Sequence, residues 1–392
     1  MPNVTNCHDP QAIRPRLETE ITYLYRPRSD WTYSHHPSLT AFRGRLYAMW
    51  SNGRVDEDAP GQRVFYASSA DGSSWSSPRP LVDSLPGKHS ELVLTAAGFH
   101  SHGDRLVAYA GQYECEAAAL ARGVRSGIDC HHEDTRLRAL VSADGETWGD
   151  MLDLGLPIVP NHPPQATRSG RLIICGNISF PYTDDPSGLS GWRMTGLYPP
   201  DMAASVYDDS EGFWHVKERL GWPVGLCEGA FYQTDDGVLH MLLRSGEQRL
   251  WLSESSDDGA TWSAPAPADF SDNDSKFHFG RVAASREAAG SRREGTRPGR
   301  LPDGRFYYVG TPDPLPRGAR NPLVLSLSED GERFDRHFVL HQDEPYGMIR
   351  RGRYKGGLYG YPHSLVHDGR LYVIVSLRKE AVAVLQTPLA AL

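Results

Sequence analysis

The segment that decides the fold is HHPSLTAFRGRLYAMWSNGRVDEDAPGQRVFYASSADGSSW, residues 35–75. Two runs of β-forming residues, 38–42 and 45–50, flank the turn Arg43-Gly44 and predict a hairpin. A third predicted strand, 63–68, leads into residues 69–75, which have the pattern S-x-D-G-x-[ST]-W. In such a turn the Asp accepts backbone N–H groups, the Gly adopts a positive φ and the Trp covers the end of the hairpin. The segment therefore predicts a small antiparallel sheet that ends in a fixed turn.

The same unit recurs along the chain. Three more copies of the turn occupy residues 142–148, 256–262 and 328–334, the last with Phe in place of Trp. These turns resemble the Asp-boxes of sialidase-like propellers, so we predict an all-β fold, a β-propeller of four-stranded antiparallel blades. We expect residues 1–392 to form a single domain whose ring is closed by a strand near 20–25. Six repeats can be counted from the predicted inner hairpins, at residues 38–50, 92–110, 165–175, 230–243, 300–309 and 364–375.

The composition argues against several classes of protein. The net charge of −8 is spread without runs of like charge, which argues against a nucleic-acid partner. No stretch approaches the roughly 18 consecutive apolar residues that span a membrane, and the N-terminus lacks an apolar signal segment. We therefore expect a soluble monomer with no membrane partner. It would be cytoplasmic as the sequence stands, or secreted or periplasmic if an export signal has been removed.

The five cysteines are odd in number and contain no C-x-x-C pair, so the sequence does not indicate a disulfide framework. Cys175 and Cys227 lie in apolar runs and are interpreted as small core residues. A bond between Cys115 and Cys130 remains open.

The repeat also predicts which side chains surround the mouth of the central channel. In an antiparallel blade, the start of the innermost strand and the end of the second strand lie at the same rim. Histidines and an arginine recur at the first of these positions, where a strand has no structural need for them. The residues at the strand starts are His36, His89, His162, Glu228, Arg297 and His363. Those at the strand ends are Asn52, Gln112 with Tyr113, Asn177, Arg244, Thr311 and Arg378.

These residue types favour one chemistry over others. An ordinary glycosidase needs two carboxylates, and this rim offers Glu228 with Glu91 nearby. A sialidase would need three arginines around a carboxylate, a Tyr–Glu nucleophile pair and an acidic Asp, of which only the arginines are apparent. His, Tyr and Arg together suit removal of the C5 proton of a uronic acid and β-elimination of its 4-O-linked group. Arg would hold the carboxylate, His would take the proton and Tyr would return one.

Residues 34–64, 297–314, 320–331 and 354–382 resemble propeller enzymes that remove terminal L-rhamnose from rhamnosyl-α-1,4-glucuronate caps of arabinogalactan and gum arabic. This group contains L-rhamnose-α-1,4-D-glucuronate lyases and similar α-L-rhamnosidases, and it is related to ulvan lyases. The resemblance implies seven blades, a glucuronate-containing carbohydrate substrate and a lyase reaction. Hydrolysis by an α-L-rhamnosidase, a sialidase-like hydrolase and a non-catalytic glycan-binding propeller remain alternatives.

The expected roles follow from position in the repeat. His89 or His162, together with Tyr113, is expected to exchange protons with the substrate, and Arg244 is expected to hold the uronate carboxylate. No cofactor and no catalytic metal are expected, while a structural cation such as Ca²⁺ remains open. The loop Asp56-Glu57-Asp58 is interpreted as structural and His131-His132-Glu133-Asp134 as a solvated loop. The expected substrate-binding residues are His36, Asn52, Asn177, Glu228, Arg297, His363 and Arg378.

Overall fold

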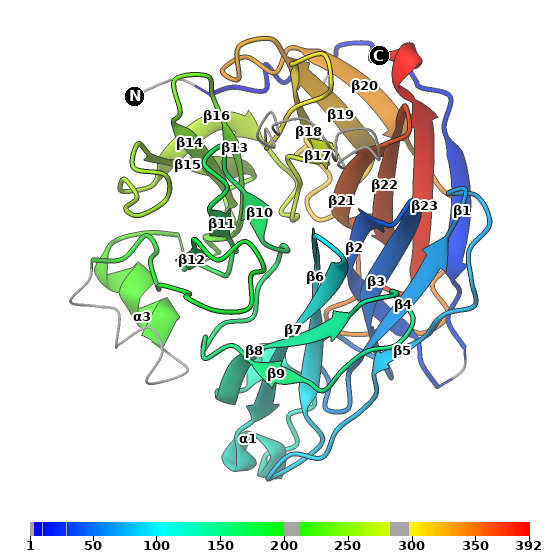
Figure 1. Cartoon of the computed structure of the whole chain (residues 1–392), viewed down its shortest axis with the longest axis vertical. Helices are drawn as coiled ribbons and strands as arrows, with labels where there is room; N and C mark the ends of the chain where they lie inside the picture. The colour runs from blue at the N-terminus through cyan, green and yellow to red at the C-terminus, as the bar shows by residue number, and fades with distance from the viewer. Residues whose placement is uncertain (1–3, 10, 29, 200–211, 224, 283–297) are drawn as a thin grey trace.

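The computed structural model describes residues 4–9, 11–28, 30–199, 212–223, 225–282 and 298–392. Within these ranges the strands form six sheets, and Figure 1 shows them arranged in a ring. The predicted all-β propeller is confirmed, and its sheets match the six repeats counted in the sequence. A seventh sheet, which the resemblance implies, is not found among the described residues.

Three sheets have four antiparallel strands in chain order. The first contains β2 (Tyr33–Phe42), β3 (Arg45–Gly53), β4 (Arg63–Ser69) and β5 (Arg79–Val82). The second contains β6 (Val93–His102), β7 (Arg105–Cys115), β8 (His132–Ser142) and β9 (Leu152–Asp153). The fourth contains β13 (Cys227–Gln233), β14 (Leu239–Arg244), β15 (Arg249–Ser255) and β16 (Ala266–Ser271).

The other sheets are less regular. The third has the short strands β10 (Gln165–Ala166), β11 (Leu172–Ile173) and β12 (Tyr182–Thr183), and the fifth has β18 (Phe306–Gly310), β19 (Leu323–Ser328) and β20 (Arg336–His341). Among the described residues the helices are α1 (Ala117–Ala121) and α3 (Gly212–Arg219), with 3₁₀ turns at Gly127–Asp129 and Leu389–Ala391. Within the described ranges, neither length nor apolar character equips any helix to cross a membrane.

The last sheet joins the two ends of the chain. It runs in the order β1 (Glu20–Tyr25), β23 (Ala381–Pro388), β22 (Arg370–Leu377), β21 (Tyr359–His367) and β17 (Arg281–Val282). β1 pairs antiparallel with β23, whereas β17 runs parallel to β21. The first strand of the chain therefore lies beside the last one, as Figure 1 shows in blue and red.

The hydrophobic core lies between neighbouring sheets. Leu39 and Trp50 of the first sheet pack with Ile374 of the last sheet, and Met49 on the other face packs with Leu94 of the second sheet. Corresponding clusters join the second and third, third and fourth, fourth and fifth, and fifth and last sheets. Each sheet is thus buried on both faces, which is why strands such as β3 and β22 are buried along almost their whole length.

The fifth repeat differs from the prediction, which placed an inner hairpin at residues 300–309. The innermost position is instead taken by the segment around His278, which forms a bridge with Val309. Arg300 contacts Phe306 in a separate bridge. A long insertion, most of which lies outside the described residues, separates the inner segment from β18 in the sequence, so the inner segment was not recognised as part of the repeat.

The Asp-box turns have the predicted geometry. In the first turn, Asp71 Oδ1 accepts the N–H groups of Ser74 and Ser73 at 2.7 and 2.9 Å. The N–H of Gly72 donates to Ser69 Oγ at 2.8 Å. The backbone hydrogen bond from Ser74, followed by that from Ser73, lowers the pKa of the Asp71 carboxyl to about 2. The same bonds recur around Asp144 and Asp330.

The third copy of the turn is shifted by one residue from the predicted register. Ser255, not Ser256, accepts the N–H of Gly259, and Asp257 accepts that of Thr261. One additional residue, Asp258, lies between Asp257 and Gly259. The S-x-D-G spacing of the other copies therefore becomes S-x-D-x-G here.

Cys115, at the end of β7, forms a disulfide with Cys130. This is the pairing that the sequence left open. Cys175 is buried, as expected for a core residue, and Cys227 is half-buried.

A substitution in an Asp-box tests how closely these turns pack against the neighbouring sheet. Gly145 has a φ of +77°, and a Cβ there would collide with the hydroxyl of Tyr47 in the first sheet. Gly145→Ala should lower the free energy of unfolding by about 2–4 kcal/mol, since it adds left-handed strain and overpacking. Gly103→Ala is the control, because Gly103 has a φ of +59° with nothing near its Cβ, and should cost only about 1 kcal/mol. Equal losses in urea unfolding would contradict the packing role.

Candidate active site

Three inner strands carry a β-bulge at the same position. The strand register shifts between His35 and Ser38 in β2, between Cys227 and Ala230 in β13, and between Gly360 and His363 in β21. A bulge turns the extra residue away from the sheet, and left-handed backbone in a non-glycine residue costs about 1–2 kcal/mol. Such strain gathers at functional sites. The bulged residues are His36, Glu228 and Tyr361, with φ values of +55°, +53° and +52°.

Tyr361 and Glu228 form the centre of the site. The Tyr361 hydroxyl donates a hydrogen bond to Glu228 Oε1. Arg244, at the end of β14, donates through Nη1 to Glu228 Oε2 at 2.8 Å and to the Tyr361 hydroxyl oxygen at 3.1 Å. One guanidinium nitrogen thus contacts both partners of a tyrosine–glutamate pair.

The surrounding charges set the protonation states of this pair. Burial alone would raise the pKa of Glu228, but Arg244 and the Tyr361 hydrogen bond lower it to about 2. Burial, reinforced by Glu228, raises the pKa of Tyr361 well above its usual value. At neutral pH the pair is therefore a carboxylate that accepts the proton of a neutral phenol.

Two more cations flank the tyrosine. The guanidinium carbon of Arg320 lies 5.6 Å and Lys276 Nζ 5.5 Å from the centroid of the Tyr361 ring. Arg320 Nη2 donates to the Asp274 carbonyl at 2.8 Å, whereas its Nη1 is buried without a hydrogen-bond partner. Burial lowers the pKa of Lys276 to about 7. Tyr361 is therefore flanked by two cationic side chains, and one donor of these, Nη1 of Arg320, has no hydrogen-bond partner.

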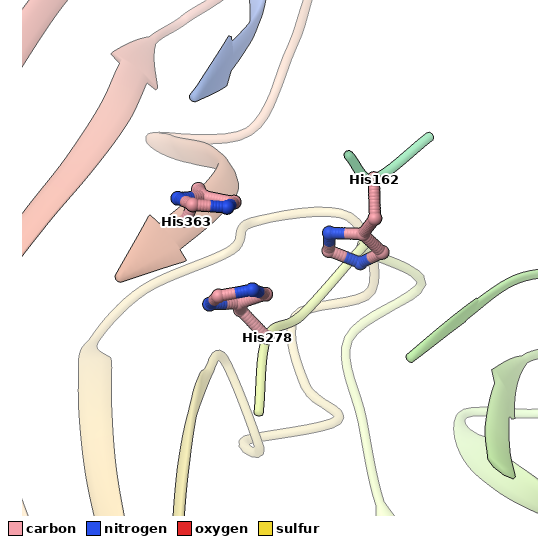
Figure 2. A group of neighbouring side chains, drawn as sticks. All are labelled: His162, His278 and His363. Carbon is pink, nitrogen blue, oxygen red and sulfur yellow. The ribbon is translucent and has the colours of Figure 1, made fainter. Parts of the chain in front are cut away.

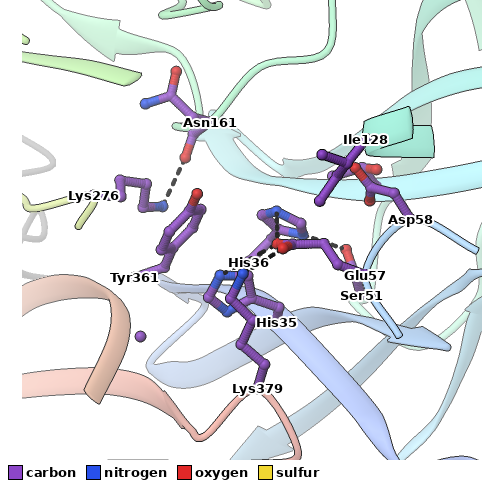
Figure 3. Close-up of polar contacts among 12 residues, drawn as sticks. His35, His36, Ser51, Glu57, Asp58, Ile128, Asn161, Lys276, Tyr361 and Lys379 are labelled. Carbon is purple, nitrogen blue, oxygen red and sulfur yellow. Dashed lines mark hydrogen bonds and ion pairs between the residues drawn. The ribbon is translucent and has the colours of Figure 1, made fainter. Parts of the chain in front are cut away.

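His35, His36 and Glu57 lie on the other side of Tyr361, as Figure 3 shows. The ring centroids of His35 and His36 are 3.9 and 5.3 Å from that of Tyr361. Glu57 forms a buried ion pair with Lys379. Burial lowers the pKa of His35 well below its usual value and that of His36 to about 4, so both rings are neutral at pH 7.

The residue after Glu57 is a second carboxyl group beside His36. Burial raises the pKa of Asp58, which favours its protonated form. The disulfide-closed segment holds this stretch in place, because Ser126 Oγ donates to the Glu57 carbonyl and the Gly127 N–H donates to the Asp58 carbonyl, both at 2.6 Å. The loop interpreted as structural from its sequence therefore brings Glu57 to His35 and His36, while Asp58 Oδ1 accepts a hydrogen bond from Gln62 at 3.2 Å.

A group of three buried histidines lies near Lys276. Figure 2 shows His162, His278 and His363 with their rings close together. The ring centroids of His278 and His363 are 4.0 Å apart, and those of His162 and His278 are 5.0 Å apart. Two of the three were expected at the rim, and the structure places them together.

The remaining predicted residues that the structure describes have contacts other than Tyr361. His89 pairs with Glu133 through Nε2 at 3.1 Å. Tyr113 is buried, with its ring stacked on His132 at 3.7 Å. Asn52 donates hydrogen bonds to Tyr33 and Ser34, and Asn177 accepts one from Lys217. Arg378 lines a separate cavity of about 550 Å³. Arg297 lies outside the described residues.

Sequence reasoning missed Tyr361, Arg320 and His278. Tyr361 was missed because β21 begins at Tyr359, four residues before the predicted start at His363. The repeated dipeptides His36-Pro37 and Tyr361-Pro362 mark the same bulge and could have located it. Arg320 lies in a loop outside the strand pattern.

The arrangement suits nucleophilic chemistry. A glutamate that takes the tyrosine proton, and an arginine that stabilises the resulting phenolate, activate the hydroxyl for attack on an electrophilic carbon. The unpaired Arg320 donor and Lys276 favour a substrate with a negative charge.

Several solved structures share the fold at low sequence identity. A protein of unknown function from Dyadobacter fermentans has 15% identity and a TM-score of 0.59, covering 94% of this chain and 98% of that one. Trypanosoma rangeli sialidase has 14% identity and a TM-score of 0.60, covering 94% and 59%. A leech intramolecular trans-sialidase has 12% identity and a TM-score of 0.59, covering 96% and 71%. The chain thus spans 59% of the trypanosomal enzyme, and only 33% of a further sialidase.

No curated protein matches the sequence. The model of the BNR repeat-like domain family matches residues 44–373, which is most of the chain. This range begins in the turn before β3 and ends within β22, so it includes every Asp-box described above. The chain therefore belongs to the BNR repeat-like domain family.

Proposed function

We propose that this protein is a retaining glycoside hydrolase that acts on glycosides of an acidic sugar. The observation that carries the proposal is the hydrogen-bonded set of Tyr361, Glu228 and Arg244. Tyrosine serves as the nucleophile in sialidases, an exception among glycosidases, which otherwise use two carboxylates. A sialidase-like hydrolase was one of the alternatives that the sequence left open, and Tyr361 with Glu228 supplies the tyrosine–glutamate pair that the sequence pattern did not reveal.

The substrate class follows from the charges. A carboxylate nucleophile would repel a sugar whose anomeric carbon itself bears a carboxylate, whereas a neutral phenol would not. The buried, unpaired Nη1 of Arg320 is suited to hold such a carboxylate. We infer a sugar of the 2-keto acid type, in which the acid group adjoins the reacting carbon.

The reaction has two steps. Glu228 takes the Tyr361 proton while the phenolate oxygen attacks the anomeric carbon, and a covalent glycosyl–tyrosine intermediate forms. Asp58, whose raised pKa favours its protonated form, gives its proton to the leaving oxygen. Water then attacks the intermediate, Asp58 takes the proton of that water, and Glu228 returns the first proton to the tyrosine.

Removal of the Tyr361 hydroxyl tests the nucleophile. Tyr361→Phe should lower kcat on a 4-methylumbelliferyl glycoside of N-acetylneuraminic acid, or of a related 2-keto acidic sugar, by at least about 10³-fold. The control is Tyr23→Phe, because Tyr23 also donates to a glutamate, Glu344, at 2.6 Å but lies on β1. Turnover that survives in Tyr361→Phe, or is lost equally in the control, would refute the assignment.

Lys276 should make substrate binding depend on pH. Burial lowers its pKa to about 7, so the ammonium is present below that pH and is lost above it. The KM for an acidic substrate should therefore rise, by up to about tenfold, between about pH 6 and about pH 8. In Lys276→Met the KM should be high and should not change over this range. A KM that rises equally in wild type and variant would assign the effect to another group.

The second candidate is the lyase reaction, elimination of L-rhamnose from rhamnosyl-α-1,4-glucuronate. The observation that favours it is His36, which is neutral at pH 7 and lies next to Tyr361. A neutral imidazole could take the C5 proton while Arg244 and Arg320 hold the uronate carboxylate. The base would then be His36 rather than the residues proposed from the sequence, His89 and His162.

Parallel incubations with gum arabic and with the acidic-sugar glycoside separate these functions. The lyase produces an unsaturated uronate with ultraviolet absorbance, whereas an α-L-rhamnosidase releases rhamnose without it. We expect neither product from gum arabic, together with cleavage of the acidic-sugar glycoside. Absorbance that depends on His36 would instead establish the lyase, and no reaction with either substrate would indicate a glycan-binding propeller.

A further inference from the structure

His35, His36 and Glu57 form a cluster that the proposed reaction does not use. Nε2 of His35 and Nε2 of His36 lie 3.7 and 4.0 Å from Oε1 of Glu57. The ligand atoms of all three lie within 4.8 Å of one another. His35 is fully buried, and its Nε2 has no hydrogen-bond partner.

The hydrogen bonds of His35 fix its tautomer. The Ser376 hydroxyl donates its single proton to the Gly360 carbonyl at 3.3 Å. Its oxygen, 2.7 Å from His35 Nδ1, must therefore accept the Nδ1 proton. The lone pair of a neutral His35 consequently lies on Nε2, the atom that faces Glu57.

His36 has a similar support. Its Nδ1 lies 3.1 Å from Ser51 Oγ, which already accepts the Ala96 N–H at 2.9 Å and has a second lone pair for an Nδ1 proton. A histidine that binds a metal through Nε2 characteristically donates its Nδ1 proton to such a partner.

When His36, like His35, donates its Nδ1 proton to its serine, acceptors converge at this point with no proton between them. Glu57 receives the Tyr33 hydroxyl at 3.3 Å on Oε1 and the Lys379 ammonium on Oε2, and the two imidazole lone pairs face the Oε1 side. Two bare nitrogens and a carboxylate oxygen at this spacing repel one another unless a cation lies between them.

We propose that His35, His36 and Glu57 bind one divalent transition-metal ion of the zinc class. Two imidazoles and one carboxylate are a common donor set for Zn²⁺ with an open position. Tetrahedral bonds near 2.1 Å would place the donor atoms about 3.4 Å apart. The separations of 3.7 and 4.0 Å from Glu57 are slightly wider, so a closing movement of the side chains would complete the site.

The three-histidine group is the alternative location, and its hydrogen bonds disfavour it. His278 Nδ1 accepts the Ser364 N–H at 2.9 Å, and His363 Nδ1 accepts the Leu39 N–H at 3.2 Å. When neutral, these rings then carry their protons on Nε2. A metal there would have to displace these bonds or deprotonate the rings, whereas the His35–His36–Glu57 cluster requires neither.

The proposed ion would lie beside Tyr361, since the His35 and Tyr361 ring centroids are 3.9 Å apart. Its charge would add to the cationic surroundings of the tyrosine. Metal binding goes beyond the proposed function and does not depend on it, so it can be measured without any substrate.

Titration of the chelator-treated full-length protein with Co²⁺ tests the site. Wild type should bind one equivalent, with the visible absorption of protein-bound cobalt and an increase in Tm. His36→Ala and Glu57→Gln should each weaken binding by more than about 100-fold, since each removes a ligand. Because Glu57→Gln also breaks the buried pair with Lys379 and can unfold the protein, His36→Ala carries the decision.

A matched pair of serine variants distinguishes the two histidine groups. Ser376→Ala removes the hydrogen bond that orients His35 and should weaken Co²⁺ binding by about 10–100-fold. Ser364→Ala makes the equivalent change beside His278 and should leave binding unaltered. The proposal is overturned if wild type binds no Co²⁺, if binding is unaffected by His36→Ala and Ser376→Ala, or if it is lost in Ser364→Ala.

Discussion

Packing between neighbouring sheets is the constraint on which the rest of this structure depends. Each sheet is buried on both faces, so an open row of sheets would leave an apolar face exposed at each end. Closure removes both faces, and the β1–β23 pairing makes the first and last segments of the chain part of one sheet. The channel is therefore lined by strands whose positions are fixed from both sides.

This rigidity explains how the site tolerates its backbone strain. His36, Glu228 and Tyr361 all have positive φ values, and together they cost a few kcal/mol. Their flanking strands belong to three different sheets, each held by its neighbours, so the strain is not relieved by local movement. The bulges turn three side chains toward one another that are more than 100 residues apart in sequence.

Much of the fold could be predicted from the sequence because its determinants are local. The Asp-boxes depend on contacts within a few residues, such as those of Asp71, and were recognised directly. Among the residues around Tyr361, His36, Glu228 and Arg244 keep the phase of the repeat and were predicted at the rim, and their roles stay predictions. Tyr361 was missed because a bulge shifts the register, and His278 because an insertion separates its segment from β18. The backbone of Glu57 and Asp58 is held by Ser126 and Gly127, almost 70 residues later, and no local pattern indicates such a contact.

The disulfide between Cys115 and Cys130 links this site to the redox state of its surroundings. The bond closes the segment that contains Ser126 and Gly127, whose hydrogen bonds hold the backbone of Glu57 and Asp58. Disulfides persist in oxidising compartments and are lost in reducing ones. Reduction would release this loop while the ring of sheets stayed closed. The protein would remain folded, but the backbone of Glu57 and Asp58 would be held less firmly beside the channel.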